Sequence, residues 1–177
     1  MASPTWFQKL HLRYLSKPLS DRAVLVHLLE TPVSSILEIG VGSGQRTQKM
    51  LFWNQLPEGS TQLRYVGVDP FESSEEGRPH LKLKQAHRML SEAGVKTLLV
   101  PGDASNALPR VAHSAQPFDL VVIDGGYDVD TAEGQALMHW LPRLASESAT
   151  VFASARSGDV LKKITVERTA ISMRRAA

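Results

Sequence analysis

Short apolar runs recur along the chain, and stretches in which apolar residues follow a helical period separate them. The runs that predict strands lie at 35–39, 63–68, 97–100, 118–124 and 150–153. Runs that are apolar at consecutive positions are typical of strands buried on both faces, as in a parallel sheet with helices on each side. The pattern therefore predicts an α/β fold with a doubly wound, mostly parallel sheet.

Helical periodicity predicts the elements around these strands. Two N-terminal helices are expected before the first strand, because Trp6–Leu15 places its apolar residues on one face and Ser20 can cap a second helix that stops before Pro32. Between the strands, the same period marks helices at 46–55, 79–93 and 107–111. Gly94 follows the second of these as a suitable C-cap.

The C-terminal end of the predicted sheet is shortened. Asp130 and Glu133 have capping-box spacing for a helix that Pro142 should kink or shorten. Only about two dozen residues follow the fifth strand, too few for a helix and two strands of ordinary length. Residues 157–164 can form a helix, and 164–171 alternate in the manner of a strand. A sheet edge left bare here would favour a homodimer.

Glycine occupies every second position after the first predicted strand, in the segment Ser35–Gln45, SILEIGVGSGQ. Glycine lets the backbone turn sharply and lets a ligand lie against main-chain N–H groups before a helix. Glu38 stands two residues before Gly40, where its carboxylate can face the same ligand. Gly44 follows Gly42 after two residues rather than three, so the loop differs from the dinucleotide-binding fingerprint.

Acidic residues stand at or just past the ends of the later strands, at Asp69, Asp103 and Asp124. Each of them alone can cap a helix or start a turn. Parallel strands present their carboxyl ends at one edge of a sheet, so we expect all three beside the glycine loop. A row of carboxylates is costly to bury unless a ligand with hydroxyl groups and a cation pairs with it.

The stretch Glu38–Gly44 resembles motif I of the class I S-adenosylmethionine-dependent methyltransferases, in which an acid precedes three alternating glycines. Matching positions extend over about residues 35–155. The resemblance implies a Rossmann-like fold, S-adenosylmethionine as cofactor and methyl transfer as activity. We expect a single domain over 1–177, with a helical cover at 1–32, a cofactor-binding core at 35–155 and a basic C-terminal segment at 156–177.

The same resemblance implies how the glycine loop and its neighbours would hold the cofactor. Gly40, Gly42 and Gly44 would pass under the ribose and the amino-acid part. Glu38 would help to hold the methionine end through bound water. Asp69 would accept hydrogen bonds from both ribose hydroxyls, since one carboxylate has two oxygens.

The resemblance also implies contacts for the adenine ring and for the transferred methyl group. Phe71 would lie beside the adenine, Asp103 would accept from its amino group, and the Ala104 N–H would donate to a ring nitrogen. Asp124 would lie near the methionine amino group and the methyl. Asp124 and Tyr127 are the candidate catalytic residues that would contact the acceptor, although Tyr127 can equally be a packing residue.

The turn after the fourth strand narrows the class of acceptor. Asp124–Tyr127 differs from the Asn/Asp-Pro-Pro-Tyr motif of amino methylases and is closer to the turn of small-molecule O-methyltransferases. Some of those bind a divalent metal with an Asp-Asn pair after the fifth strand, where this chain has Ala153–Arg156. The six histidines show no metal-ligand spacing. We expect no metal site, and a small molecule that accepts the methyl on oxygen or nitrogen.

Composition excludes several other classes of protein. The chain has no cysteine, which rules out a disulfide framework and a cysteine nucleophile. It shows neither a signal peptide nor an apolar run long enough for a membrane span, and we expect a cytoplasmic protein. Basic residues gather near the C-terminus, but no aromatic residue is interleaved with them for base stacking, so nucleic acid is not an expected partner.

Three other functions stay open on the sequence alone. A non-catalytic module for S-adenosylmethionine binding or dimerisation is favoured by the short C-terminal end. An NAD-type oxidoreductase domain is disfavoured by the glycine spacing and by the position of Asp69. An aminopropyltransferase of the spermidine-synthase type is disfavoured, because it should carry an Asp-Ser-Ser/Asp-like turn after the fourth strand, where this chain has Asp124-Gly125-Gly126.

Overall fold

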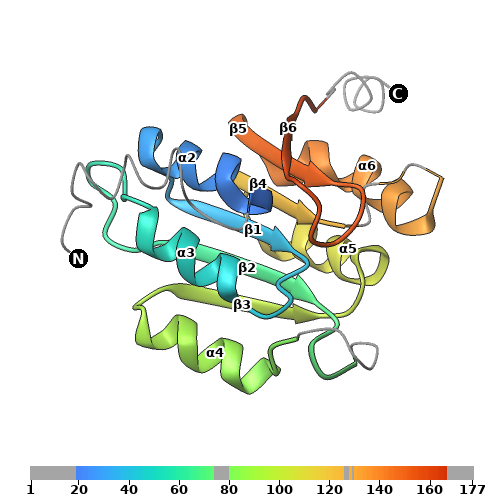
Figure 1. Ribbon diagram of the computed structural model, residues 1–177, viewed down its shortest axis with the longest axis horizontal. Helices are drawn as coiled ribbons and strands as arrows, with labels where there is room; N and C mark the ends of the chain where they lie inside the picture. Colours follow the sequence, from blue (N-terminus) through green and yellow to red (C-terminus); the bar gives the residue numbers. More distant parts are fainter. Residues whose placement is uncertain (1–18, 74–79, 126–127, 129, 167–177) are drawn as a thin grey trace.

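A computed structural model describes residues 19–73, 80–125, 128 and 130–166. Six strands form one sheet in the order β3-β2-β1-β4-β5-β6, and only β6 is antiparallel to its neighbour (Figure 1). Their bounds are β1 Ser35–Ile39, β2 Arg64–Asp69, β3 Lys96–Pro101, β4 Phe118–Asp124, β5 Ala145–Ser154 and β6 Lys162–Ile164. The predicted doubly wound, mostly parallel α/β fold is confirmed.

Helices cover both faces of the sheet. Those on one face are α2 Arg22–Glu30, α3 Gln45–Trp53 and α4 Leu83–Glu92, and those on the other are α5 Ala104–Ser114 and α6 Ala132–Leu144 (Figure 1). Two short 3-10 turns, η1 Leu19–Asp21 and η2 Phe71–Ser73, precede α2 and follow β2. Right-handed crossovers between parallel strands produce this alternation of faces.

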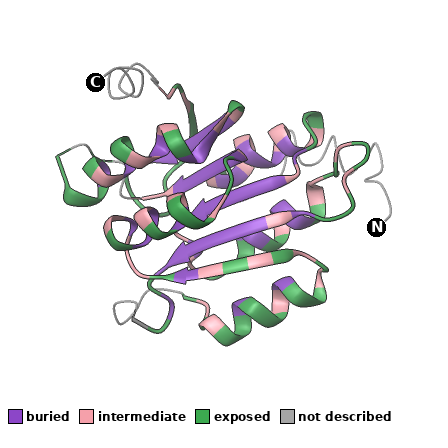
Figure 2. Cartoon of the chain, turned by 180° about the vertical axis from the view of Figure 1, so that it is seen from behind, coloured by how far each residue is buried: buried purple, intermediate pink, exposed green. Residues whose placement is uncertain are grey.

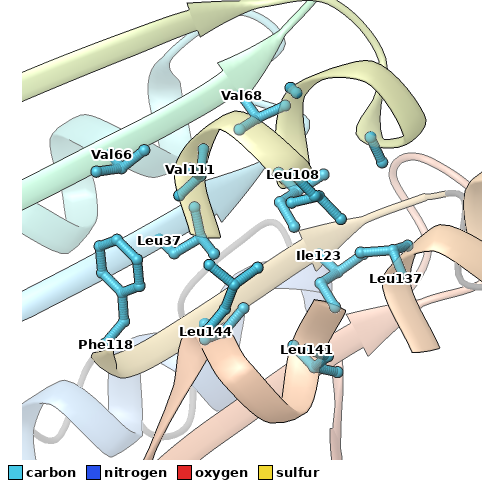
Figure 3. Packing of buried hydrophobic residues seen from close by; sticks show 14 of the residues in the cluster. Leu37, Val66, Val68, Leu108, Val111, Phe118, Ile123, Leu137, Leu141 and Leu144 are labelled. Atoms are coloured by element: carbon cyan, nitrogen blue, oxygen red, sulfur yellow. The ribbon is translucent and has the colours of Figure 1, made fainter. Parts of the chain in front are cut away.

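The core lies in two layers because successive side chains of a strand point to opposite faces. In β4, Val121 and Ile123 pack under α5 and α6, whereas Leu120 and Val122 pack under α2 and α3. Figure 3 shows the first layer, where Phe118 and Ile123 lie between the sheet and the two helices. The inner strands are buried along almost their whole length, and the edge strand β3 is mixed (Figure 2).

The N-terminal cap of α6 differs from the sequence prediction. The cap of α6 is Thr131, whose hydroxyl accepts from the Gly134 N–H at 3.0 Å, and not the predicted Asp130 and Glu133 pair. A threonine hydroxyl at this position satisfies one of the first N–H groups of the helix, as the predicted aspartate would have done. Pro142 lies inside the last turn, and the helix ends two residues later at Leu144.

The segment after β5 is a hairpin and not the predicted helix over 157–164. It turns through bends at 155–159 and returns as β6 beside β5, pairing Ala153 with Lys162 and Val151 with Ile164. Leu161, 1% exposed, anchors this return under α2. Of the strand predicted over 164–171, Ile164 belongs to β6, and the part from 167 onward lies outside the described residues.

Some predictions concern segments that the structure does not describe. The first N-terminal helix, Trp6–Leu15, and the candidate acceptor residue Tyr127 lie outside the described residues. Within the described ranges, no helix has the length and apolar character needed to cross a bilayer.

Candidate cofactor site

The loop between β1 and α3 takes a course that only glycine allows. Gly40, Gly42 and Gly44 all have positive φ, at 85°, 57° and 76°. A Cβ on Gly40 would lie 2.6 Å from the Asp124 carbonyl oxygen, and one on Gly44 would lie 2.8 Å from a Leu81 methyl. Gly40 is therefore needed for both the backbone turn and the close approach of the β4 backbone, whereas Gly44 is needed mainly for its positive φ, because the Leu81 methyl group can move.

Glu38 is fully buried in β1, one residue before the strand ends. Its carboxylate accepts hydrogen bonds from Arg46 Nε at 2.8 Å, Thr47 Oγ1 at 2.7 Å and Tyr65 OH at 2.5 Å. Burial and the neighbouring Glu38 charge raise the pKa of Tyr65 well above its ordinary value, so the phenol remains a donor. Glu38 thus engages the chain's own donors, and its contact with the cofactor through water stays a prediction.

Arg46 is the principal residue of the site that the sequence prediction missed. Its guanidinium donates to Glu38, to Asp124 Oδ2 from Nη1 at 2.8 Å, and to the Gly40 carbonyl from Nη2. Asp21 lies further out, 3.8 Å from Nη1. Burial alone would lower the Arg46 pKa, but the Glu38 and Asp124 carboxylates raise it above its usual range, so the side chain is always a cation.

Asp124 ends β4 and gathers donors from three segments. Besides Arg46, its carboxylate accepts from the Gly158 N–H at 2.9 Å and from the Ser154 hydroxyl at 3.3 Å. A Cβ on Gly125 would lie 2.9 Å from the Ser157 nitrogen, which shows how closely the β5–β6 turn packs on the end of β4. Asp124 therefore joins the glycine loop region to the C-terminal hairpin.

Asp69 and Phe71 follow β2 on the other side of the glycine loop. The Asp69 carboxylate accepts from the Gly42 N–H and the Phe71 N–H, both at 2.9 Å, and is 6% exposed. Phe71 is fully buried in a small cluster with Val41 and Ala86, at a φ of 49°. Its ring is a core side chain here, and its predicted place beside the adenine stays untested.

Asp103 is the N-cap of α5. It accepts from the Asn106 N–H at 2.9 Å, the Ser105 hydroxyl at 2.5 Å and the Asn106 amide at 2.8 Å. The Ser105 hydrogen bond, with those from Asn106, lowers the Asp103 pKa below its ordinary value. Ala104 begins the helix, so its N–H is among the first four that have no acceptor within the helix.

The structure brings the predicted residues to one edge of the sheet. The glycine loop follows β1, and Asp69, Asp103 and Asp124 follow or end β2, β3 and β4. In the order β3-β2-β1-β4, the chain changes direction across the sheet between β1 and β4, where ligands bind in open α/β sheets. Across the described parts of the chain, no group of three His, Asp or Glu residues is placed to hold a metal ion.

Comparison with known proteins agrees with this geometry. A family model described as "Methyltransferase domain" matches residues 37–154, which covers the glycine loop and all three strand-end aspartates. The chain belongs to this methyltransferase family. The match confirms the class inferred from the glycine motif, with its cofactor S-adenosylmethionine, and disfavours an NAD-type oxidoreductase. None of the curated proteins compared with the chain matches it.

Solved structures of methyltransferases share the fold. The O-methyltransferase TomG from Streptomyces achromogenes is 24% identical with a TM-score of 0.54, covering 80% of this chain and 56% of its own. A methyltransferase from Geobacter sulfurreducens is 18% identical, TM-score 0.51, at 78% and 61% coverage. PaMTH1 from Podospora anserina is 16% identical, TM-score 0.51, at 79% and 53%. The chain thus spans little more than half the length of these proteins.

The residues at the edge fit S-adenosylmethionine unevenly. The side toward β2 and β3 offers carboxylates at Asp69 and Asp103 and the first N–H groups of α5, which suit ribose hydroxyls and an adenine edge. On the side toward β4, the Arg46 cation already forms ion pairs with Glu38 and Asp124, the carboxylates that would receive the ligand's ammonium group. The carboxylates on the β4 side are thus paired with a side-chain cation, whereas Asp69 and Asp103 on the β2 and β3 side are paired with uncharged donors.

Proposed function

We propose that this protein transfers a methyl group from S-adenosylmethionine to a small-molecule acceptor, on oxygen or nitrogen. The observation that carries the proposal is that the glycine loop and three aspartates lie at the same edge of the sheet, namely Asp69, Asp103 and Asp124. Membership of the methyltransferase family supports it. TomG, a relative in fold, is an O-methyltransferase, and this favours oxygen as the accepting atom.

In this proposal the β2 and β3 ends hold the nucleoside. Asp69 accepts from the ribose hydroxyls with the lone pairs that its two backbone donors leave, since a carboxylate offers about four acceptor positions. Asp103 and the Ala104 N–H take the adenine edge. Because Asp69 also fixes the Gly42 N–H, ribose binding and the shape of the glycine loop depend on the same carboxylate.

The bound cofactor supplies an electrophilic methyl group on a sulfonium, so the protein's task is mainly alignment of the acceptor. Among the described residues, we propose that Asp124 lies nearest to the transferred methyl group. Its donors Arg46 and Gly158 favour a positioning role for this carboxylate over removal of the acceptor's proton. Tyr127 remains a proposed acceptor contact outside the described residues.

The test is calorimetric titration with S-adenosylhomocysteine of the wild type, Asp69→Ala and Asp119→Ala. We expect wild-type binding that Asp69→Ala weakens by at least about a hundredfold, the size of two lost hydrogen bonds to a charged group. Asp119 is the matched control: it is also an aspartate of the sheet, but it bonds Ser34 and Ser35 at the opposite ends of the strands. No binding by a folded wild type would refute the proposal.

A second candidate function is a non-catalytic module that binds the cofactor without turnover. It is favoured by the donors that already engage Asp124, the described residue proposed to lie near the methyl group. Binding of S-adenosylhomocysteine without methyl transfer to a panel of phenols, carboxylic acids and amines would support it. We also propose a homodimer that forms through β6, the last strand in the sheet order, and sedimentation tests it.

A further inference from the structure

Three oxygen acceptors converge where β1 and β4 end: the Glu38 carboxylate, the Gly40 carbonyl and the Asp124 carboxylate. One guanidinium, that of Arg46, donates to all three, with Nε–Oε1 and Nη1–Oδ2 distances of 2.8 Å. A primary ammonium has three donors and no acceptor, so such a set of oxygens is what an amino-acid ammonium group requires. In this structure the cation that pairs with these oxygens is Arg46.

The ion pairs of Arg46 with Glu38 and Asp124 are expected to persist because breaking them costs a large free energy. Arg46 is 8% exposed and Glu38 is fully buried, so withdrawing the guanidinium would leave buried carboxylate charge uncompensated. Arg46 also lies in the first turn of α3, where the helix dipole disfavours a cation. The carboxylates therefore hold Arg46 in a position that the helix alone would not favour.

We propose that Arg46 is a specificity-determining residue that competes with the α-ammonium group of the ligand for these three acceptors. The proposal rests on the proposed function, because S-adenosylmethionine and S-adenosylhomocysteine carry that ammonium group. Recognition in the wild type then comes mainly from the nucleoside half, through Asp69 and Asp103. The protein should discriminate only weakly between S-adenosylhomocysteine and 5′-methylthioadenosine, a nucleoside thioether that lacks the amino-acid end.

The experiment compares the affinities of these two ligands in four proteins: the wild type, Arg46→Met, Arg46→Lys and Lys49→Met. In Arg46→Met the carboxylates lose their cation, so the preference for S-adenosylhomocysteine over methylthioadenosine should rise about tenfold or more, as for one charge-assisted hydrogen bond. Lysine at position 46 keeps the positive charge but has one nitrogen in place of the planar, multidentate guanidinium. The preference of Arg46→Lys for S-adenosylhomocysteine should therefore rise less than that of Arg46→Met.

Lys49→Met is the matched control. Lys49 lies one turn further along α3 and pairs at 3.9 Å with Asp21, not with Glu38 or Asp124. Its removal changes the charge of the helix by the same amount but frees none of the three acceptors. The preference should stay at the wild-type value.

Thermal unfolding gives a second readout, which is the difference between the increases in melting temperature that the two ligands cause. Loss of a purely structural residue would not change this difference. Arg46→Met should melt lower than the wild type, and S-adenosylhomocysteine should restore more of its melting temperature than methylthioadenosine does, because the ligand's ammonium replaces the lost cation. A purely structural Arg46 would leave the difference between the two ligands as it is in the wild type. If Arg46→Met does not fold, the neutral polar variant Arg46→Gln takes its place, and an unchanged preference in that variant overturns the proposal.

The outcomes separate this inference from the proposed function. A wild type that binds neither ligand refutes the proposed function. A wild type that binds both, with a preference that Arg46→Met leaves unchanged, refutes the competition alone. A preference that falls in Arg46→Met also refutes it, since Arg46 would then bind the ligand's carboxylate.

Discussion

Asp103 follows β3 and Asp124 ends β4 at the same edge of the sheet, yet their hydrogen-bond partners come from different distances along the chain. Asp103 bonds Ser105 and Asn106, which are two and three residues away. Asp124 bonds Arg46 and Gly158, which lie 78 and 34 residues away. The same residue type after a strand is a local helix cap in one place and a junction of three segments in the other.

This difference shows where the stability and the specificity of the site are concentrated. A local cap forms whenever its helix forms, and it contributes about 1 kcal/mol. The network of Glu38, Arg46 and Asp124 forms only when β1, α3 and β4 have docked, and it is buried, so breaking it is expensive. The buried network should therefore respond to substitution far more than the cap does.

The largest expected effect is that of Glu38→Ala. This change leaves the guanidinium of Arg46 and the hydroxyls of Thr47 and Tyr65 without their buried acceptor, and it should lower the free energy of unfolding by about 4 kcal/mol. Urea denaturation measures it. In the control, Glu92→Ala removes a partner of Arg88 that is 72% exposed and should change stability by less than about 0.5 kcal/mol. Equal losses would show that the network does not carry the stability.

A glycine pair sharpens the comparison further. Gly40 and Gly59 have nearly the same φ, 85° and 82°, but a Cβ meets the Asp124 carbonyl oxygen at 2.6 Å on Gly40 and nothing within 4 Å on Gly59. Gly59→Ala should cost about 1 kcal/mol from backbone strain alone, and Gly40→Ala about 3 kcal/mol because the β1–β4 junction must also move. Matching denaturation midpoints for the two variants would contradict the close approach.

The smallest effect should be that of Asp103→Ala, about 1 kcal/mol near neutral pH, the loss of one helix cap. Because hydrogen bonds from Ser105 and Asn106 lower the Asp103 pKa in the folded protein, its contribution is complete above the unfolded pKa of about 3.9 and is lost as the pH falls through the lower folded value. The difference from wild type should stay constant from about pH 8 to 5 and shrink below about pH 4. Asp103→Asn keeps a neutral cap and should show a smaller pH dependence.

Much of the fold could be predicted because its signals are local. The apolar run at 118–124 gives β4, the glycine spacing gives the β1–α3 turn, and Gly94 ends α4 with a φ of 71°. The predicted cap of α6 was wrong by one residue, since Thr131 and Asp130 are both good N-caps and only the docking of the helix decides between them. The β6 strand was missed because its three residues are defined by pairing with β5.

The site shows the same division. The glycines and aspartates carry a sequence pattern, whereas Arg46 was missed because an arginine early in a polar helix is usually solvated. Two signals were present in the sequence. A buried acid in a strand, Glu38, requires a positive partner, and a cation in the first turn of a helix is unfavourable unless something nearby compensates it. Which arginine meets which acid still depends on the sheet order β2-β1-β4.

Leu161 completes the cover of the first described helix, although more than a hundred residues separate them. It packs with Val24 and Leu28 of α2, and its N–H donates to the Ser20 carbonyl at 3.0 Å. During translation, α2 leaves the ribosome long before Leu161 is added, so part of its apolar face stays uncovered while the sheet is being synthesised. Docking of the β5–β6 hairpin is therefore a late step of folding, because it covers this apolar face only after Leu161 has been synthesised.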